Sequence, residues 1–258
     1  MTIYQVDAFN NQIFKGNPAA VCPLTTWIST ELMQSIAEEN NLSETVFFVK
    51  KNNIYEIKWF TPTCEIDLCG HATLAAAHII FTELNYSEKV LEFNSKSGKL
   101  TVEKNEDWYT LNFPSEGINE IETPSILEKA LNISILKTYK GKWKLLVELK
   151  NEVDVANLAP NFNLLSKLES NGIIVTSKGD NVDFVSRFFA PKLNINEDPV
   201  TGSAHTLLIP FWAKKLNKTN LNAIQLSKRV GILKCKYLNE RVEMSGQAIT
   251  YLKGELTL

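Results

Sequence analysis

The stretch from Leu68 to Phe81 constrains the fold more than any other part of the chain. It has the sequence LCGHATLAAAHIIF, and no formal charge occurs between Asp67 and Glu83. Because apolar residues occupy every side of a helical projection, this pattern predicts a helix that is buried all round. The run is too short for the ~20 residues that a membrane-spanning helix needs. We therefore expect it to form the central helix of a protein core.

A second stretch, Gly202–Ala213, repeats the pattern. A Phe-x-Pro segment precedes each helix, at 60–62 and at 189–191, and the offset of 129 (189 − 60) is half of the 258-residue chain. A chance likeness of two short apolar helices is the alternative to a duplicated unit. Because many short strand patterns surround only two long apolar helices, we predict an α+β fold with two pseudo-symmetric lobes. Each lobe would be a mixed sheet or barrel wrapped around its central helix.

The segment Pro114–Gly117 is the best candidate for a boundary between the lobes. We expect an N-terminal lobe over 1–114, completed by the last strand at about 248–258, and a C-terminal lobe over 115–247. The pattern also predicts a helix that begins at Ser29 or Thr30 and runs to about Asn40. A further helix is expected near 125–131, whereas 151–163 is polar and no element is assigned to it.

Composition narrows the functional classes. A hydrophobic fraction of 44% and a charged fraction of 22% are typical of a folded globular protein. The net charge of −2 argues against a nucleic acid or an anionic membrane as partner. The chain has no GxGxxG, P-loop or HExxH motif, so neither a nucleotide site nor a metal site is predicted. The four scattered cysteines and the lack of a signal-peptide pattern suggest free thiols in the cytoplasm.

Three polar residues near the first helix are candidates for chemistry. Glu44 lies between a predicted helix and an apolar strand, where a half-buried carboxylate would suit acid/base catalysis, although the residue pattern alone favours a solvated turn. His71, in the first helical turn, is as readily a hydrogen-bonded core histidine as a functional one, and its place beside a glycine at the helix start favours function slightly. His78, in the middle of the helix, is interpreted as structural.

The start of the second helix carries Asp198, Ser203 and His205. Asp198 has a strong alternative as a simple cap of backbone N–H groups, and the role of His205 stays open. If the two helix starts faced each other, an acid, an imidazole and a hydroxyl would converge in one polar pocket. Such a pocket would suit proton transfer next to a carboxylate-bearing carbon.

Cys69 is the other candidate base, because a helix N-terminus lowers the pKa of a thiol. A racemase with two thiol bases would need a second cysteine at the start of the second helix, where the chain has Asp198–Thr201 instead. We therefore interpret Cys69 as a packed, neutral thiol.

In combination, these motifs resemble the phenazine-biosynthesis PhzF-like isomerase family, which has the diaminopimelate-epimerase-like fold. The matching stretches are VDAF (6–9), FKGNPAAV (14–21), NLSET (41–45), LCGHAT (68–73) and EDPVTGSAH (197–205). They occur in order over nearly the whole chain, which makes the combination specific.

The resemblance implies a cofactor-free, homodimeric enzyme with its site between the two helix starts. The phenazine enzyme isomerises trans-2,3-dihydro-3-hydroxyanthranilate by moving a proton. The acid/base glutamate of the family corresponds to Glu44, which reverses the interpretation from the residue pattern alone. The pocket histidine, aspartate and serine correspond to His71, Asp198 and Ser203, and Gly70 and Gly202 would let backbone N–H groups approach a substrate carboxylate.

One position departs from the family pattern: Val230 stands where glycine is usual, which affects the local turn or the pocket rim. The resemblance predicts a proton-shift isomerase acting on a small carboxylate-bearing molecule. Two other functions stay open: a racemase or epimerase of amino or hydroxy acids that uses Cys69, and a ligand-binding protein without turnover.

Overall fold

The computed structural model describes residues 1–258 and divides them into two compact units. Unit 1 comprises residues 1–112 and 244–258, and unit 2 comprises residues 113–243. Strands β8 (Trp108–Pro114) and β16 (Arg241–Gly246) run through the two boundaries. The limits expected from the sequence, 114 and 247, fall at the end of β8 and one residue after β16.

Unit 1 is mostly sheet, with two helices. Its other strands are β1 (Thr2–Ala8), β2 (Asn17–Leu24), β3 (Glu44–Lys51), β4 (Ile54–Phe60), β5 (Glu65–Ile66), β6 (Val90–Ser95), β7 (Gly98–Asn105) and β17 (Ala248–Glu255). Its helices are α1 (Thr30–Asn40) and α2 (Gly70–Thr82).

Unit 2 has the same kind of composition. Its other strands are β9 (Asn119–Ile121), β10 (Lys137–Lys140), β11 (Lys144–Glu148), β12 (Gly172–Lys178), β13 (Phe184–Phe189), β14 (Asn220–Gln225) and β15 (Gly231–Leu238). Its helices are α3 (Ser125–Leu131), α4 (Glu152–Ala156), α5 (Phe162–Leu165), the 3₁₀ turn η1 (Pro191–Leu193) and α6 (Gly202–Leu216).

The two units share one strand order, and this confirms the duplicated α+β fold. Hydrogen-bonded neighbours follow the order β17-β1-β2-β3-β4-β6-β7-β8 in unit 1 and β9-β10-β11-β12-β13-β14-β15-β16 in unit 2. The parallel pairs occupy the same places, β2–β3 and β4–β6 in the first and β11–β12 and β13–β14 in the second. The central helices α2 and α6 each connect the second parallel pair of their unit.

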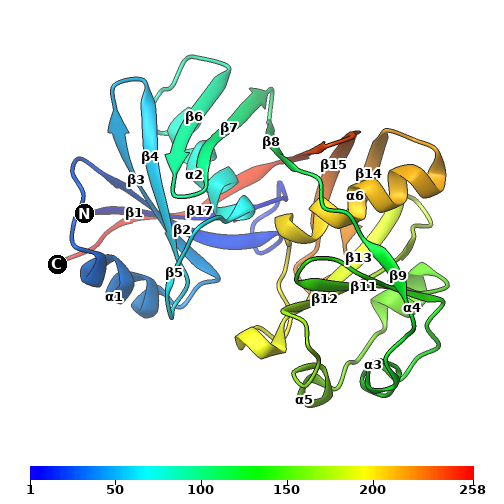
Figure 1. Ribbon diagram of the computed structural model, residues 1–258. Helices are drawn as coiled ribbons and strands as arrows, with labels where there is room; N and C mark the ends of the chain where they lie inside the picture. Colours follow the sequence, from blue (N-terminus) through cyan, green and yellow to red (C-terminus); the bar gives the residue numbers. More distant parts are fainter. The chain divides into compact units, whose positions relative to one another are not determined.

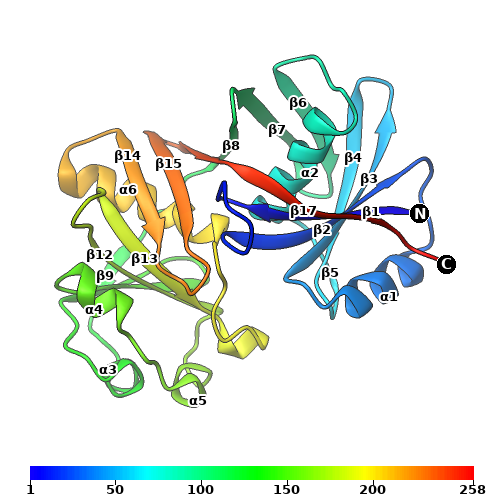
Figure 2. The same ribbon diagram turned by 180° about the vertical axis from the view of Figure 1, so that it is seen from behind.

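Helix α2 is the buried helix that the sequence predicts. Residues 71–81 are all buried, and the helix contacts β1, β2, β3 and β17. Figure 2 shows β1 and β17 side by side with the two termini close together, where the Leu256 N–H donates to the Met1 carbonyl. No helix of the structure combines the length and apolar character needed to cross a lipid bilayer.

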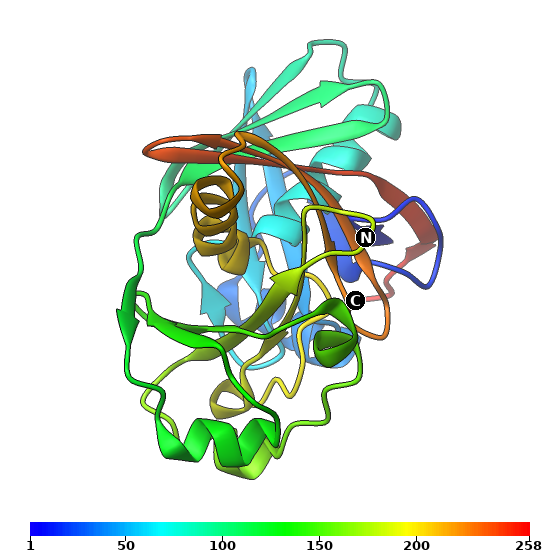
Figure 3. The same cartoon turned by 90° about the vertical axis from the view of Figure 1, so that its right-hand side faces the viewer.

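The sheet of unit 2 has helices on both faces (Figures 1 and 3). Leucine, valine and isoleucine side chains of β11, β12 and β13 pack against α3, α4 and α5 in one apolar cluster. Side chains of alternate parity on the same strands face α6, where Phe184 stacks on Trp212. The same alternation decides which face of unit 1 carries the polar residues described below.

Several short elements were not predicted. Helix α4 lies within the stretch 151–163, to which the sequence assigns no element, and α5 begins in this stretch and ends at Leu165; they are five and four residues long. Each is capped locally, by the side chains of Asn151 and Asn161. A helix of about one turn is too short to show a repeat of apolar residues in the sequence. Such helices are stabilised by tertiary packing.

Val230 adopts a backbone conformation that is unfavourable for a residue with a branched side chain. Its φ is +59°, in the left-handed region where a β-branched residue is strained. The turn is fixed by its N–H, which donates to the Ser227 carbonyl and hydroxyl, and by Gly231, whose Cβ would lie 2.3 Å from Val200. The departure from the family glycine therefore leaves the turn in place and adds strain to it.

We expect Val230→Gly to stabilise the protein by about 0.5–1 kcal/mol. Relief of a left-handed penalty of roughly 1–2 kcal/mol outweighs the greater flexibility that glycine gives the unfolded chain. Urea unfolding of the two proteins measures the difference. Val230→Ala keeps a Cβ and should recover less, and equal midpoints for all three would disprove the strain.

Candidate active site

The start of helix α2 places His71 among three polar side chains of unit 1. His71 Nε2 lies 2.9 Å from Glu44 Oε2, and His71 Nδ1 lies 3.5 Å from Cys69 Sγ and 3.2 Å from Asn17 Nδ2. The side chains of His71 and Glu44 are 5% and 12% exposed, and Asn17 is fully buried. The imidazole thus connects a carboxylate on one side to a thiol and an amide on the other.

The strand register directs Glu44 to this place. On β3, Phe47 packs into the apolar cluster around α1, so the alternate residues Glu44 and Val46 face α2. Parallel pairing of Ala19 with Glu44 sets the first residue of β3 beside the beginning of β2. Gly16, just before β2, has φ +64° and a Cβ position 2.1 Å from the Ala8 carbonyl oxygen, so only glycine fits the turn that delivers Asn17.

Electrostatics make His71 a strong base. Burial by itself lowers the pKa of the imidazole, but Cys69 and Glu44, which can both carry negative charge, raise it well above its ordinary value. Burial, followed by the Glu44 carboxylate, raises the pKa of the Cys69 thiol, although His71 opposes this shift. Cys69 is therefore protonated near neutral pH, and Glu44 is the charge that holds a proton on His71.

The contact between Glu44 and His71 leaves hydrogen-bonding capacity unused. Oε2 and Nε2 lie 2.9 Å apart, and both atoms are buried without another hydrogen-bond partner. Buried polar atoms of this kind are uncommon in native structures, and a catalytic role is one of the reasons for which they occur. A carboxylate and an imidazole at this distance can exchange a proton and can pass it to a third molecule.

Glu44, Cys69 and His71 also have the side-chain types that bind metal ions. One ligand atom each from Glu44, Cys69 and His71 lies within 4.8 Å of the others. However, the two ring nitrogens point to opposite sides of the imidazole, one toward Glu44 and the other toward Cys69. One ion cannot lie on both sides of the ring, so the arrangement fits a hydrogen-bonded chain better than a coordination sphere.

The start of helix α6 is the second predicted polar region, in unit 2. The Thr201 hydroxyl donates to Asp198 Oδ2 at 2.5 Å, and the side chain of Thr201, the N-cap residue, makes no capping hydrogen bond. The alternative that Asp198 caps backbone N–H groups stays a prediction. Ser203 is exposed in the first turn, and Gly202 is buried. Whether the two helix starts share one site stays a prediction.

Both central helices begin without a side-chain cap. The N-cap residues Cys69 and Thr201 make no capping hydrogen bond, whereas α1, α4 and α5 are each capped by a serine or asparagine. Uncapped N–H groups and the helix dipole favour a bound carboxylate.

Comparison with known proteins identifies the family. A family model described as phenazine biosynthesis-like protein, PhzC-PhzF, matches residues 6–254. The chain belongs to this family.

The similarity extends over whole chains. An uncharacterised isomerase of Pseudomonas aeruginosa is 47% identical over 258 residues, covering 100% of this chain and 99% of the relative. A crystal structure of a PhzF-family protein from Enterococcus faecalis is 50% identical with a TM-score of 0.98, covering 100% of this chain and 99% of that chain. A predicted epimerase of P. aeruginosa shares the fold, with a TM-score of 0.75 at 17% identity and coverage of 100% and 99%. The PhzF-like protein described here thus belongs to a family in which relatives are named isomerases, and it has the diaminopimelate-epimerase-like fold.

Only unit 1 of this family member has a glutamate at the Glu44 position of the duplicated fold. By strand position, the counterpart of Glu44 is Gly172, since each opens the second strand of the first parallel pair. A Cβ at Gly172 would lie 2.3 Å from the Phe188 ring, so an aromatic side chain fills the place of the carboxylate. The helix starts align Cys69 with Thr201 and His71 with Ser203. The duplicated fold therefore offers one glutamate, not two opposed bases.

Two residues near these groups were missed as candidates. Asn17 belongs to the Gly-Asn-Pro motif but had no predicted role, and Gln225 lies in an unremarkable strand pattern. Of the other histidines, His205 donates from Nδ1 to the Thr201 carbonyl at 2.8 Å, and His78 lies between Tyr109 and Thr250. Both are buried, which agrees with a structural role for His78.

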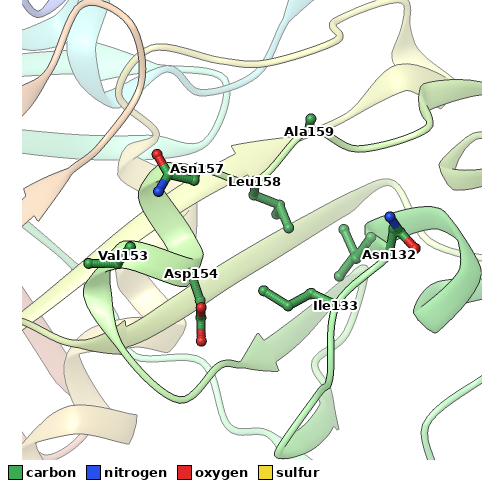
Figure 4. Close-up of a pocket in the computed structure, with 8 residues that line it drawn as sticks. Asn132, Ile133, Val153, Asp154, Asn157, Leu158 and Ala159 are labelled. Carbon is green, nitrogen blue, oxygen red and sulfur yellow. The ribbon is translucent and has the colours of Figure 1, made fainter.

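A separate surface pocket lies in unit 2 (Figure 4). Its volume is about 240 Å³, and it lies between Asn132 and Ile133 on one side and α4 with Leu158 and Ala159 on the other. None of the predicted site residues lines it. Its one carboxylate, Asp154, has no titratable partner among the lining residues, so the pocket offers no acid/base pair.

The buried histidines predict acid sensitivity. Burial lowers the folded pKa of His205 and of His78 to about 4. Against an unfolded value near 6.5, each contributes stability that is present above pH 6.5 and lost as the pH falls toward 4, about 2 kcal/mol per histidine at pH 4.5. His71 acts oppositely, because its raised pKa gives stability that is present below pH 6.5 and is lost as the pH rises through the folded pKa. Urea unfolding at pH 7 and 4.5 should show a smaller acid loss for His205→Asn than for the wild type, and equal losses would contradict this.

Proposed function

We propose that this protein is a cofactor-independent isomerase that moves a proton on a small carboxylate-bearing substrate, with Glu44 as the acid/base group. The observation that supports this most strongly is the buried Glu44–His71 pair at 2.9 Å at the start of an uncapped helix. The family adds that relatives of this chain are named isomerases.

The proposed reaction conserves atoms and electrons. The Glu44 carboxylate removes a proton from a substrate carbon while the electron pair shifts along the unsaturated substrate. The resulting carboxylic acid then returns the proton to another carbon. His71, which holds its own proton, stabilises the carboxylate form of Glu44 before the first step and after the second.

The substrate carboxylate would be bound by backbone N–H groups at Gly70, in the first turn of a helix whose N-cap residue makes no capping hydrogen bond. Asp198, Ser203 and Gly202 are proposed to position the substrate, and this proposal rests on the family resemblance together with the uncapped start of α6. A homodimer and a cytoplasmic location are proposed on the same resemblance, and sedimentation velocity tests the first.

The racemase that uses Cys69 is the weaker alternative. The raised pKa of Cys69 disfavours the thiolate, and Thr201 is its counterpart at the other helix start. We expect Cys69→Ser to change turnover by less than about tenfold, well below the loss expected from removing a general base. Iodoacetamide should be tested in a Cys64→Ser background, because Cys64 is exposed whereas Cys69 is buried. Inactivation that a ligand prevents would favour the thiol.

The deciding experiment is proton NMR of trans-2,3-dihydro-3-hydroxyanthranilate with the protein in D₂O. Loss of the C3 proton signal with formation of an isomer supports the proposal and names the substrate type. If this compound is inert, other unsaturated or α-substituted carboxylates are screened for deuterium uptake. Thermal stabilisation by a carboxylate without deuterium uptake from any compound would indicate a binding protein and overturn the proposal.

A further inference from the structure

Gln225, the last residue of β14, makes three hydrogen bonds to the loop that precedes α6. Its Oε1 accepts from the Thr201 N–H at 2.9 Å, and its Nε2 donates to the Asp198 carbonyl at 2.8 Å and to Thr201 Oγ1 at 3.2 Å. The side chain is fully buried. A buried amide with three well-placed partners holds the loop in one conformation.

The backbone N–H of Thr201 determines which group donates and which accepts in each of these hydrogen bonds. The Thr201 N–H can only donate, so the oxygen of the Gln225 amide must face it and the nitrogen must face Asp198 and Thr201 Oγ1. Because Oγ1 then accepts from the amide, its own proton is directed to Asp198 Oδ2, 2.5 Å away. The result is a one-way chain that ends on the carboxylate, from Gln225 through Thr201 to Asp198.

The backbone of the loop is held at further points. The Asp198 N–H donates to the Phe188 carbonyl at 3.1 Å, and the Thr201 carbonyl accepts from His205 Nδ1 at 2.8 Å. Asp198 is thus attached to β13 through its N–H and to β14 through its carbonyl. These contacts lie within unit 2, so they specify where the carboxylate is held relative to the first turn of α6.

The duplicated unit shows that the fold does not require this arrangement. The counterpart of Gln225 in unit 1 is Ser95, since each ends its strand and pairs with the glycine that opens the next strand. Ser95 is only partly buried, and its hydroxyl donates to the Gly98 carbonyl in its own turn. The helix start at Cys69 forms without a side chain from that strand.

We propose that Gln225 is a positioning residue that holds Asp198 in the orientation needed to bind the substrate. The functional part of this inference rests on the proposed isomerase, whereas the loop geometry does not. Gln225 does not touch the substrate; it acts through Thr201 and Asp198.

The first test needs no substrate. Gln225→Met keeps the length of the side chain and removes all three hydrogen bonds, and Gln225→Glu keeps the acceptor for the Thr201 N–H. Exchange of the Thr201 amide proton, followed by NMR, should be at least tenfold faster in Gln225→Met and close to wild type in the matched control Asn220→Asp, an exposed site on the same strand. Unchanged exchange in Gln225→Met would overturn the inference whether or not the protein proves to be an isomerase.

The second test separates positioning from a general loss of structure. In the NMR turnover assay, Gln225→Glu should lower kcat/KM about 10- to 100-fold, because a carboxylate oxygen then faces the Asp198 carbonyl. In an Asp198→Asn background the same change should have less than a threefold effect, since residues that act through one another are not additive. Additive losses, or full turnover in Gln225→Glu, would overturn the inference. If the wild-type protein is inactive on every carboxylate, the proposed function is refuted but the role of Gln225 in holding the loop is not. The exchange rate of the Thr201 amide proton then decides that role.

Discussion

Glu44→Gln is expected to abolish turnover while leaving the fold intact. Glutamine has the same shape, and its carbonyl oxygen can still meet His71 Nε2, but the amide cannot take up and return a proton. Loss of a general acid/base group typically costs 10²- to 10⁴-fold, and deuterium exchange into the substrate should fall by this factor. The melting temperature should stay within a few degrees of wild type, since the side chain is buried in a polar contact that the amide largely preserves.

The same variant has a second readout that requires no substrate. Glu44 is one of the groups that raise the pKa of His71, so the pKa of His71 should fall toward its ordinary value when the charge is removed. NMR titration can follow it because the chain has three histidines, and the other two have pKa values near 4.

Glu38→Gln on the exposed face of α1 makes the same chemical change away from the site and should leave both quantities as in wild type. Full turnover in Glu44→Gln would show that Glu44 is not the catalytic base. An unchanged titration of His71 would show that the carboxylate does not hold its proton.

Trp212→Ala is expected to cost about 3–5 kcal/mol of unfolding free energy, the largest stability effect we predict. Trp212 is 2% exposed, stacks on Phe184 with an angle of 4° between the rings, and contacts Phe211 edge-on. Its indole N–H donates to Thr176 Oγ1 at 2.9 Å. The substitution removes this bond and leaves a cavity between α6 and the sheet of unit 2.

Two further variants separate the contributions that ring packing and the hydrogen bond of Trp212 make to stability. Trp212→Phe keeps the ring against Phe184 and loses the hydrogen bond, so about 1–2 kcal/mol is expected. Trp143→Ala removes a tryptophan that is 60% exposed and should cost below about 0.5 kcal/mol. Urea unfolding with tryptophan-independent circular dichroism measures all three. Similar losses for Trp212→Ala and Trp143→Ala would contradict the packing described for α6.

The local elements were predictable where a residue pattern repeats over several turns or strands. Helix α1 begins after Ser29, whose hydroxyl accepts from the Leu32 N–H at 3.2 Å, as the capping pattern indicates. The helix near 125–131 was likewise predicted and is α3. Strands β9 and β10 were not, because three or four residues carry too little alternation to be separated from the surrounding loop.

The candidate site was predictable in part. Glu44 and His71 were both named from the sequence, but from the residue pattern alone Glu44 was better explained as a solvated turn residue. Their contact joins positions 27 residues apart through the parallel pairing of β2 and β3, which no local pattern reports. Gln225 escaped notice for the same reason, since its three partners lie 24 to 27 residues upstream.

The sequence by itself indicated the duplicated α+β plan, because two apolar helix patterns, each preceded by a Phe-x-Pro segment, have to be buried and short strand patterns surround them. The strand pairing of the tertiary structure showed that there is one glutamate and not two, since Gly172 stands at the corresponding strand position in unit 2. Only the tertiary structure decided that Glu44 faces α2 and meets His71. The direction of a side chain on a strand depends on the register with its neighbours, and that register is set by contacts distant in the chain.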